Sequence, residues 1–318
     1  MKVYQDLEQF GKLPYAVVTS GTFDGVHVGH QKILARLEEV RRTSGGESVL
    51  LTFWPHPRQV VAKDGNPPKL LTTIEEKTAL LARHGVEHLI IIPFTKEFSQ
   101  LSSDEFVRRV LVEKIGTKKL VIGYDHRFGR NREGSFEYLV QHAPSYGFQV
   151  EEISPQDVEH VTVSSTRVRN ALLEGNVHVA NEYLGRPYSL SGTVVRGNQL
   201  GRTIGYPTAN IRVNDEFKLV PADGVYAVRV GWREQTYGGM LNIGLRPTVN
   251  GTLRTVEVHL FDFDTDIYDE VLTLYFVEKL RAEQKFAGLE ALKAQLRQDE
   301  ADARRLLRLI SDEDWLFG

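Results

Sequence analysis

Residues 21–30 read GTFDGVHVGH and follow a short apolar run, YAVV, over 15–18. The apolar run is typical of a buried strand, and residues 31–42 carry apolar side chains at helical spacing. The ten residues are therefore predicted to form a strand-to-helix turn. Their glycines stand where the backbone must bend or lie close to another group.

Two histidines, His27 and His30, mark the start of the predicted helix. Residues three apart share a helix face, so both imidazoles can reach the same ligand. A helix N-terminus also offers unpaired N–H groups and a partial positive charge, which favour an anion. The pattern indicates a nucleotide phosphate site. A purely structural glycine turn is one alternative, and a metal pair is a weaker one, because Asp24 is the only nearby carboxylate and cysteine is absent.

Length and composition favour a globular protein of two domains. The chain has 318 residues, of which 41% are hydrophobic and 25% charged. Its net charge of −3 supplies no basic field for nucleic acid or for an acidic membrane, so neither is expected as a partner. There is no cysteine, the first ten residues lack an apolar signal core, and the strongly apolar run 89–93 is too short to span a bilayer. We expect a cytoplasmic protein.

The first half alternates between strand-like and helix-like segments. Strands are predicted at 48–54, 86–92, 119–123 and 148–153, and helices at 74–83, 103–115 and 136–142. This alternation predicts a parallel sheet with helices on both faces. Ligands of such sheets bind beyond the carboxyl ends of the strands.

Three polar segments follow these strands. Prolines stiffen PHPR at 55–58, which carries His56 and Arg58. The loop 123–134, GYDHRFGRNREG, holds Phe128 for stacking, and VSSTRVR at 163–169 pairs helix-capping hydroxyls with two arginines. Taken alone, each segment is also compatible with an ordinary surface turn, a polar loop or a helix cap.

The second half changes to short β segments. They are predicted at 188–195, 225–230, 237–241, 254–261 and 271–277. Regularly spaced short strands favour a small antiparallel barrel, and 282–310 has the periodicity of a closing helix. Residues 185–187, GRP, are the predicted linker between domains 1–185 and 186–318. The segment 197–210, GNQLGRTIGYPTAN, is glycine-rich and lacks strong apolar patterning.

The quoted motifs resemble those of one enzyme family. GTFDGVHVGH resembles the HxGH signature of nucleotidyltransferases in its flavin-adenylylating form, and 197–210 resembles the ATP segment of riboflavin kinases. With motifs in order in both halves, the chain is similar to the bacterial bifunctional riboflavin kinase/FMN adenylyltransferase family, also called FAD synthetases. The resemblance implies a Rossmann-like nucleotidyltransferase domain, then a Greek-key-like barrel with a C-terminal helix.

It also implies two reactions. ATP phosphorylates riboflavin to FMN in the C-terminal domain, and a second ATP adenylylates FMN to FAD in the N-terminal domain with release of pyrophosphate. The implied ligands are ATP, riboflavin, FMN and FAD, with Mg²⁺ accompanying ATP. Two alternatives stay open: a nucleotidyltransferase with another phosphorylated acceptor, and a non-catalytic flavin or nucleotide carrier. A homo-oligomer is compatible with the sequence, which does not decide the oligomeric state.

For the adenylyltransferase, the resemblance implies that His27 and His30 are catalytic and touch the α-phosphate. The residues implied to bind ATP are Gly21, Thr22, Phe23, Asp24, His27, His30, Ser164, Ser165, Thr166 and Arg167. Those implied to bind the flavin are His56, Arg58, Asp125 and Phe128. His126 stands where the family usually has Phe, so the contact it makes is open.

For the kinase, the resemblance implies that Glu257 is the general base. The residues implied to bind ATP are Gly197, Gly201, Arg202, Gly205, Pro207, Thr208 and Asn210. Thr208 and Asn210 would also contact Mg²⁺, for which hydroxyl and amide oxygens are suitable ligands. Arg281 would lie near the flavin, and Asp269 stands where the family usually has Gly.

Overall fold

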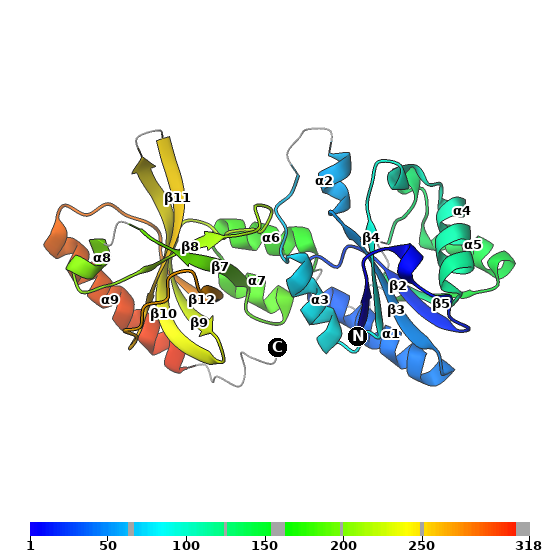
Figure 1. The fold of residues 1–318 in the computed structure, drawn as a ribbon, viewed down its shortest axis with the longest axis horizontal. Coiled ribbons are helices and arrows are strands. Elements are labelled where there is room, and N and C mark those ends of the chain that lie inside the picture. Colours follow the sequence, from blue (N-terminus) through cyan, green and yellow to red (C-terminus); the bar gives the residue numbers. More distant parts are fainter. Residues whose placement is uncertain (63–66, 124–125, 154–162, 198–199, 249–250, 310–318) are drawn as a thin grey trace. The chain divides into compact units, whose positions relative to one another are not determined.

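The computed structural model describes residues 1–62, 67–123, 126–153, 163–197, 200–248 and 251–309 (Figure 1). It divides into two compact units, Met1–Ser164 and Ser165–Gly318. The contacts group residues 165–185 with the second unit. The predicted boundary after Gly185 stays a prediction.

The first unit contains a six-stranded parallel sheet with helices on both faces, as predicted. The strand order is β1-β4-β3-β2-β5-β6. The strands are β1 (Lys2–Tyr4), β2 (Ala16–Ser20), β3 (Glu47–Trp54), β4 (His88–Pro93), β5 (Thr117–Gly123) and β6 (Gln149–Ile153). The helical segments are η1 (Leu7–Gln9), α1 (Val28–Ser44), α2 (Pro57–Val61), α3 (Ile74–Arg83), η2 (Phe98–Gln100), α4 (Ser103–Glu105), η3 (Phe106–Ile115), η4 (Arg130–Arg132) and α5 (Phe136–Tyr146). The three-residue β1 is too short to have been predicted from its pattern.

Alternate residues of the central strands supply apolar cores on both faces of the sheet. Leu50 of β3 packs with α1 and α3 on one face, whereas Val18 and Leu51 pack with η3 and α5 on the other. All five residues of β2 are buried, which is typical of a central parallel strand covered on both faces. The carboxyl end of β2 leads directly into the signature loop, residues 21–27.

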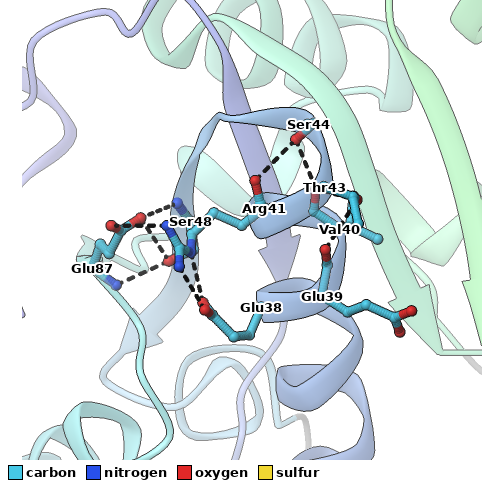
Figure 2. Close-up of polar contacts among 8 residues, drawn as sticks. All are labelled: Glu38, Glu39, Val40, Arg41, Thr43, Ser44, Ser48 and Glu87. Atoms are coloured by element: carbon cyan, nitrogen blue, oxygen red, sulfur yellow. Dashed lines mark hydrogen bonds and ion pairs between the residues drawn. The ribbon is translucent and has the colours of Figure 1, made fainter.

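A polar cluster fixes the far end of α1 to the sheet (Figure 2). Arg41 pairs with Glu38 at 2.6 Å and with Glu87 at 3.5 Å. Glu87 Oε2 accepts a hydrogen bond from the backbone N–H of Ser48, at the start of β3. Gly45 closes the helix with φ +67°. With this end held, the start of α1 has a fixed position after β2.

The second unit contains a closed antiparallel barrel of six strands, in the order β10-β11-β8-β7-β12-β9. The strands are β7 (Ser189–Val195), β8 (Ala209–Val213), β9 (Gly224–Trp232), β10 (Gln235–Thr248), β11 (Gly251–Leu260) and β12 (Val271–Arg281). The predicted barrel is confirmed, with two differences. Residues 209–213 form an additional strand, and β10 extends well beyond the predicted 237–241, because it pairs with β11 along the whole length of β11.

Helices of the second unit flank the barrel. α6 (Ser165–Glu174) and α7 (Val177–Leu184) precede β7, the short α8 (Leu200–Thr203) precedes β8, and α9 (Leu289–Arg308) packs on β9, β10 and β12. The predicted closing helix is thus confirmed, although it begins at Leu289, after Gly288. Within the described ranges, no helix combines the length and the apolar character needed to cross a bilayer.

Candidate active sites

The signature loop between β2 and α1 has an unusual backbone. Phe23 and Val26 have φ of +46° and +41°, and Gly25 has φ of +84°. Positive φ is costly for aromatic and β-branched residues, at about 1–3 kcal/mol each, and such strain clusters at functional sites. Phe23 and Val26 are also buried, so packing holds the loop in this shape.

Asp24 anchors the loop from inside the protein. Its Oδ1 accepts hydrogen bonds from the backbone N–H groups of Leu71 at 2.9 Å and Thr72 at 3.2 Å. The N–H of Gly25 donates in turn to the Thr72 hydroxyl at 3.2 Å. Asp24 is 1% exposed, so in this structure it holds the segment before α3 against the signature loop.

His27 and His30 lie together at the start of α1. His27 is the N-cap residue, just before the helix, and its Nδ1 accepts from the N–H of His30 at 3.4 Å. The two rings stack with centroids 3.7 Å apart, and Phe23 lies 4.8 Å from the His30 ring. A Cβ on Gly29 would lie 3.2 Å from the His27 ring, so glycine permits this arrangement.

The environment keeps His30 neutral. Burial lowers its pKa well below the usual value, and positive charge on His27 and Lys77 lowers it further. Its Nδ1 is buried and has no hydrogen-bond partner among the described residues. Such an atom is available to a bound ligand.

His56 caps a helix in this structure. It is the N-cap residue of α2, and its Nδ1 accepts from the N–H of Arg58 at 3.1 Å. Its own N–H donates to Gln59 Oε1 at 3.0 Å, and the residue is 7% exposed. The roles of His56 and Arg58 toward a flavin stay predictions.

The loop after β5 packs inward through Phe128, which is 9% exposed and lies 5.6 Å from Phe106. His126 stacks on Phe128 at 5.7 Å, and its Nε2 lies 3.3 Å from the hydroxyl of Ser20, the last residue of β2. Burial lowers the pKa of His126 to about 4, with a smaller effect of Arg132. His126 thus joins the ends of β2 and β5. Asp125 lies outside the described residues.

The predicted triphosphate residues fall in both units. Ser164 ends the first unit, and Ser165 begins α6 in the second. Thr166 and Arg167 are exposed in the first turn of α6. Their joint action with His27 and His30 stays a prediction.

The kinase candidates form a row across three strands of the barrel. Glu257 on β11 is paired directly with Asn210 on β8 and with Asn242 on β10. Directly paired residues present their side chains on the same face, so the carboxyl group lies between two amides. The Thr208 hydroxyl donates to Glu257 Oε2 at 3.5 Å, and Arg246 forms an ion pair with Glu257 Oε1.

The glycine-rich segment lies close to this row. A Cβ on Gly197 would approach Asn210 Cγ to 2.5 Å, and one on Gly201 would overlap the carbonyl of Tyr206. Gly205 has φ of +87°, and Arg202 is exposed. The carbonyl of Pro207 accepts a hydrogen bond from the ring of His259 at 2.7 Å.

The donors in the barrel fit a magnesium ion that is held mainly by phosphates and water. Over the described residues, no cluster of three or more His, Asp or Glu side chains could hold a metal ion. Thr208 and Asn210 instead offer one hydroxyl and one amide oxygen beside the carboxylate of Glu257.

Arg281 is engaged within the protein. It makes a bidentate ion pair with Asp299 of α9, at 3.0 Å from Nε to Oδ1 and 2.8 Å from Nη2 to Oδ2. Asp299 is 3% exposed and also accepts from Gln295 at 2.8 Å. This pair fastens α9 to the end of β12, and a flavin contact of Arg281 stays a prediction.

Two residues at the barrel site were not among the predicted site residues, namely Asn242 and Arg246. Both lie on β10, four positions apart and therefore on the same face of the strand. The signal that could have found them is the alternation through NIGLR, with Asn, Gly and Arg at every second position. It was missed because the predicted strand ended at residue 241, whereas β10 continues to Thr248.

Comparisons with known proteins agree with this geometry. The family model of FAD synthetase matches residues 11–167, and that of riboflavin kinase matches residues 184–307. A bifunctional riboflavin kinase/FMN adenylyltransferase of Pseudomonas fluorescens is 42% identical over 91% of this chain and 92% of its own length. The protein of that name from Escherichia coli K12 is 39% identical over 97% of this chain and 99% of its own.

The fold also recurs in a solved structure. A crystal structure described as a macrolide-efflux protein from Streptococcus pneumoniae is 33% identical, has a TM-score of 0.85, and covers 95% of this chain and 98% of its own. Identity and coverage of this extent, together with both family models, establish the relationship. The chain belongs to the bifunctional riboflavin kinase/FMN adenylyltransferases, enzymes that convert riboflavin to FMN and FMN to FAD.

Proposed function

We propose that the two reactions use separate sites, the signature loop for adenylyl transfer and the row around Glu257 for phosphorylation. The domain division proposed with them is 1–185 and 186–318, which is supported by family matches ending at residue 167 and beginning at 184. The observation that carries the proposal is the meeting of Thr208, Asn210 and Glu257 in the barrel, remote in sequence from the stacked histidines.

In adenylyl transfer, an oxygen of the FMN phosphate attacks the α-phosphorus of ATP, and pyrophosphate leaves with the electron pair of the broken P–O bond. No protein nucleophile is needed, so the site aligns the phosphates and stabilises their charge. The start of α1 offers N–H groups and a positive dipole to the α-phosphate. His30, kept neutral by burial, can donate one hydrogen bond there, and His27 lies beside it.

The other contacts of this site are proposed on the family resemblance. Ser165, Thr166 and Arg167 would hold the β- and γ-phosphates, since a guanidinium can pair with two phosphate oxygens. His56 and Phe128 would lie near the isoalloxazine ring or the phosphate group of FMN. In support, His56 follows the carboxyl end of β3, and Phe128 lies in the loop after β5, on the edge where ligands of parallel sheets bind.

In the kinase step, Glu257 would accept the proton of the riboflavin 5′-hydroxyl as that oxygen attacks the γ-phosphorus of ATP, and ADP leaves. Thr208 and Asn210 would hold Mg²⁺, which supplies positive charge to the phosphates. Arg246 keeps the carboxylate of Glu257 oriented through their ion pair. A cytoplasmic location belongs to the same proposal, because both steps consume ATP.

The test is to incubate the full chain with riboflavin, ATP and Mg²⁺ and to separate the flavins by chromatography. His30→Ala should stop FAD formation while FMN accumulates. Glu257→Ala should stop FMN formation from riboflavin, yet still convert added FMN to FAD. The exposed residues His178 and Glu234 provide matched controls, as His178→Ala and Glu234→Ala, which should leave both steps unchanged. The assignment is wrong if either site variant impairs only the opposite step.

A further inference from the structure

Lys77 carries a buried charge, and the proposed mechanisms of the two reactions assign it no role. It lies on α3, is 2% exposed, and shares its buried face with Leu81, one turn later. Its ammonium donates to the Thr52 hydroxyl at 3.5 Å and lies 5.9 Å from the ring centre of Trp54. It forms no ion pair with any described residue. Buried charges in proteins are normally paired, so this one calls for an explanation.

The position of Lys77 is next to the signature loop. Thr52, which accepts from Lys77, donates its own hydroxyl to the carbonyl of Thr22 at 3.3 Å. The segment before α3 is bonded to the same loop through Asp24, whose charge acts on Lys77. Lys77 therefore supports the loop from the side of α3.

The charge of Lys77 also reaches the histidines. It lowers the pKa of His30, after the larger effects of burial and of His27. At the start of α1, His30 Nδ1 is buried and has no hydrogen-bond partner among the described residues. Among the described residues, a buried ammonium without an ion pair and a buried imidazole nitrogen without a hydrogen-bond partner thus both lie at the signature loop.

We propose that Lys77 is a positioning residue for adenylyl transfer, which braces the signature loop through Thr52 and Thr22 and adds a buried positive charge to the ATP phosphate site. The inference rests on the proposed placement of ATP at His27 and His30. In a medium of low polarity such a charge acts over a longer distance than in water. It therefore favours the negative charge that gathers on the phosphates during transfer.

A structural role alone explains Lys77 less well. An apolar side chain of the same length would fill the space beside Leu81 and Trp54 without a buried charge. Burial lowers the pKa of Lys77 to about 8, and Asp24 acts in the opposite direction. The side chain is thus still charged at neutral pH, where the enzyme must bind a triphosphate.

The test compares Lys77→Met, which removes the charge and keeps the length, with Lys77→Arg, which keeps the charge. FAD formation is assayed from FMN and MgATP, and FMN formation by the same chain serves as an internal control. For Lys77→Met we expect kcat/KM for FAD formation to fall about 10- to 100-fold, with the kinase step unchanged. Lys77→Arg should retain most of the wild-type kcat/KM for FAD formation. Lys96→Met, at an exposed lysine, should behave as wild type.

The pH profile separates positioning by charge from simple packing. In the wild type, kcat/KM for FAD formation should fall as the pH rises through about 8, where Lys77 loses its proton. This fall in kcat/KM should be absent in Lys77→Met and should move to higher pH in Lys77→Arg. Asp24 and His30, whose charges interact with that of Lys77, and His27, which interacts with His30, remain in all variants.

Two results would overturn the inference. One is FAD formation by Lys77→Met within twofold of wild type, and the other is an unchanged pH profile in both variants. If His30→Ala abolishes FAD formation while Lys77→Met does not, only the role of Lys77 is refuted. If His30→Ala is also active, the proposed ATP site itself is wrong.

Discussion

Replacing Lys77 by Met should stabilise the first unit at neutral pH. Burial lowers the pKa of Lys77 from its usual 10.5 to about 8. At about 1.4 kcal/mol per pKa unit, keeping the group charged in the folded state costs about 3 kcal/mol. This value already includes the attraction of Asp24. Methionine is flexible and of similar length, so it fills the same space without that cost.

The gain should depend on pH with a definite sign. Below about pH 8 the side chain is charged in both the folded and the unfolded state, so the full cost is present. Between about 8 and 10.5 the folded state releases its proton first, and the stability of the wild type rises with pH. Above that range the cost disappears, and the advantage of Lys77→Met should vanish with it.

Urea unfolding followed by the fluorescence of Trp54 measures this effect. Trp54 packs in the core beside α3, and replacing Trp232 and Trp315 by Phe leaves it as the only tryptophan. The free energy of unfolding should rise by about 3 kcal/mol at pH 7 and by much less at pH 10. Lys96→Met should change it by less than about 0.5 kcal/mol. A destabilised Lys77→Met at pH 7, or a gain that is equal at both pH values, would refute the reasoning.

Two further predictions concern the second unit. Asp299→Ala removes the buried partner of Arg281. Breaking a buried ion pair usually costs about 3–5 kcal/mol of stability, and because Arg281 is partly exposed we expect the free energy of unfolding of the second unit in urea to fall by about 3 kcal/mol. A fall below about 1 kcal/mol would show that the pair does not fasten α9. Gly197→Ala places a Cβ 2.5 Å from Asn210 Cγ, so the rate of FMN formation should fall at least about tenfold while FAD formation from added FMN is retained. Gly11→Ala meets nothing within 4 Å and should alter neither rate, and an unimpaired Gly197→Ala would contradict the close packing on Asn210.

Much of the first unit is readable from local pattern. The apolar runs, the helical periodicity after the signature loop, and the alternation of the two segment types predict the parallel sheet and both helical layers. These features depend on neighbours within a few residues, so the sequence carries them directly. The same holds for the turn at 21–27, where the order of glycines and histidines is specific.

Some features of the barrel cannot be predicted from the local sequence pattern. β8 has five residues, and its identity as a strand comes from pairing with β7 and with β11, the second of which is distant in sequence. Arg246 meets Glu257 because β10 and β11 pair in one register. A slip of one residue would turn one of the two side chains to the other face, and no local pattern specifies the register by itself.

Lys77 is the clearest case of what only the tertiary structure decided. In the sequence IEEKTALLAR it stands among charged residues of an amphipathic helix, where a lysine is normally solvated. The ten residues of the signature loop predicted a phosphate site, but they gave no sign of the buried cation beside it. Its burial follows from the way α3 packs against β3 and the loop, and such packing depends on contacts between segments that are far apart in the chain.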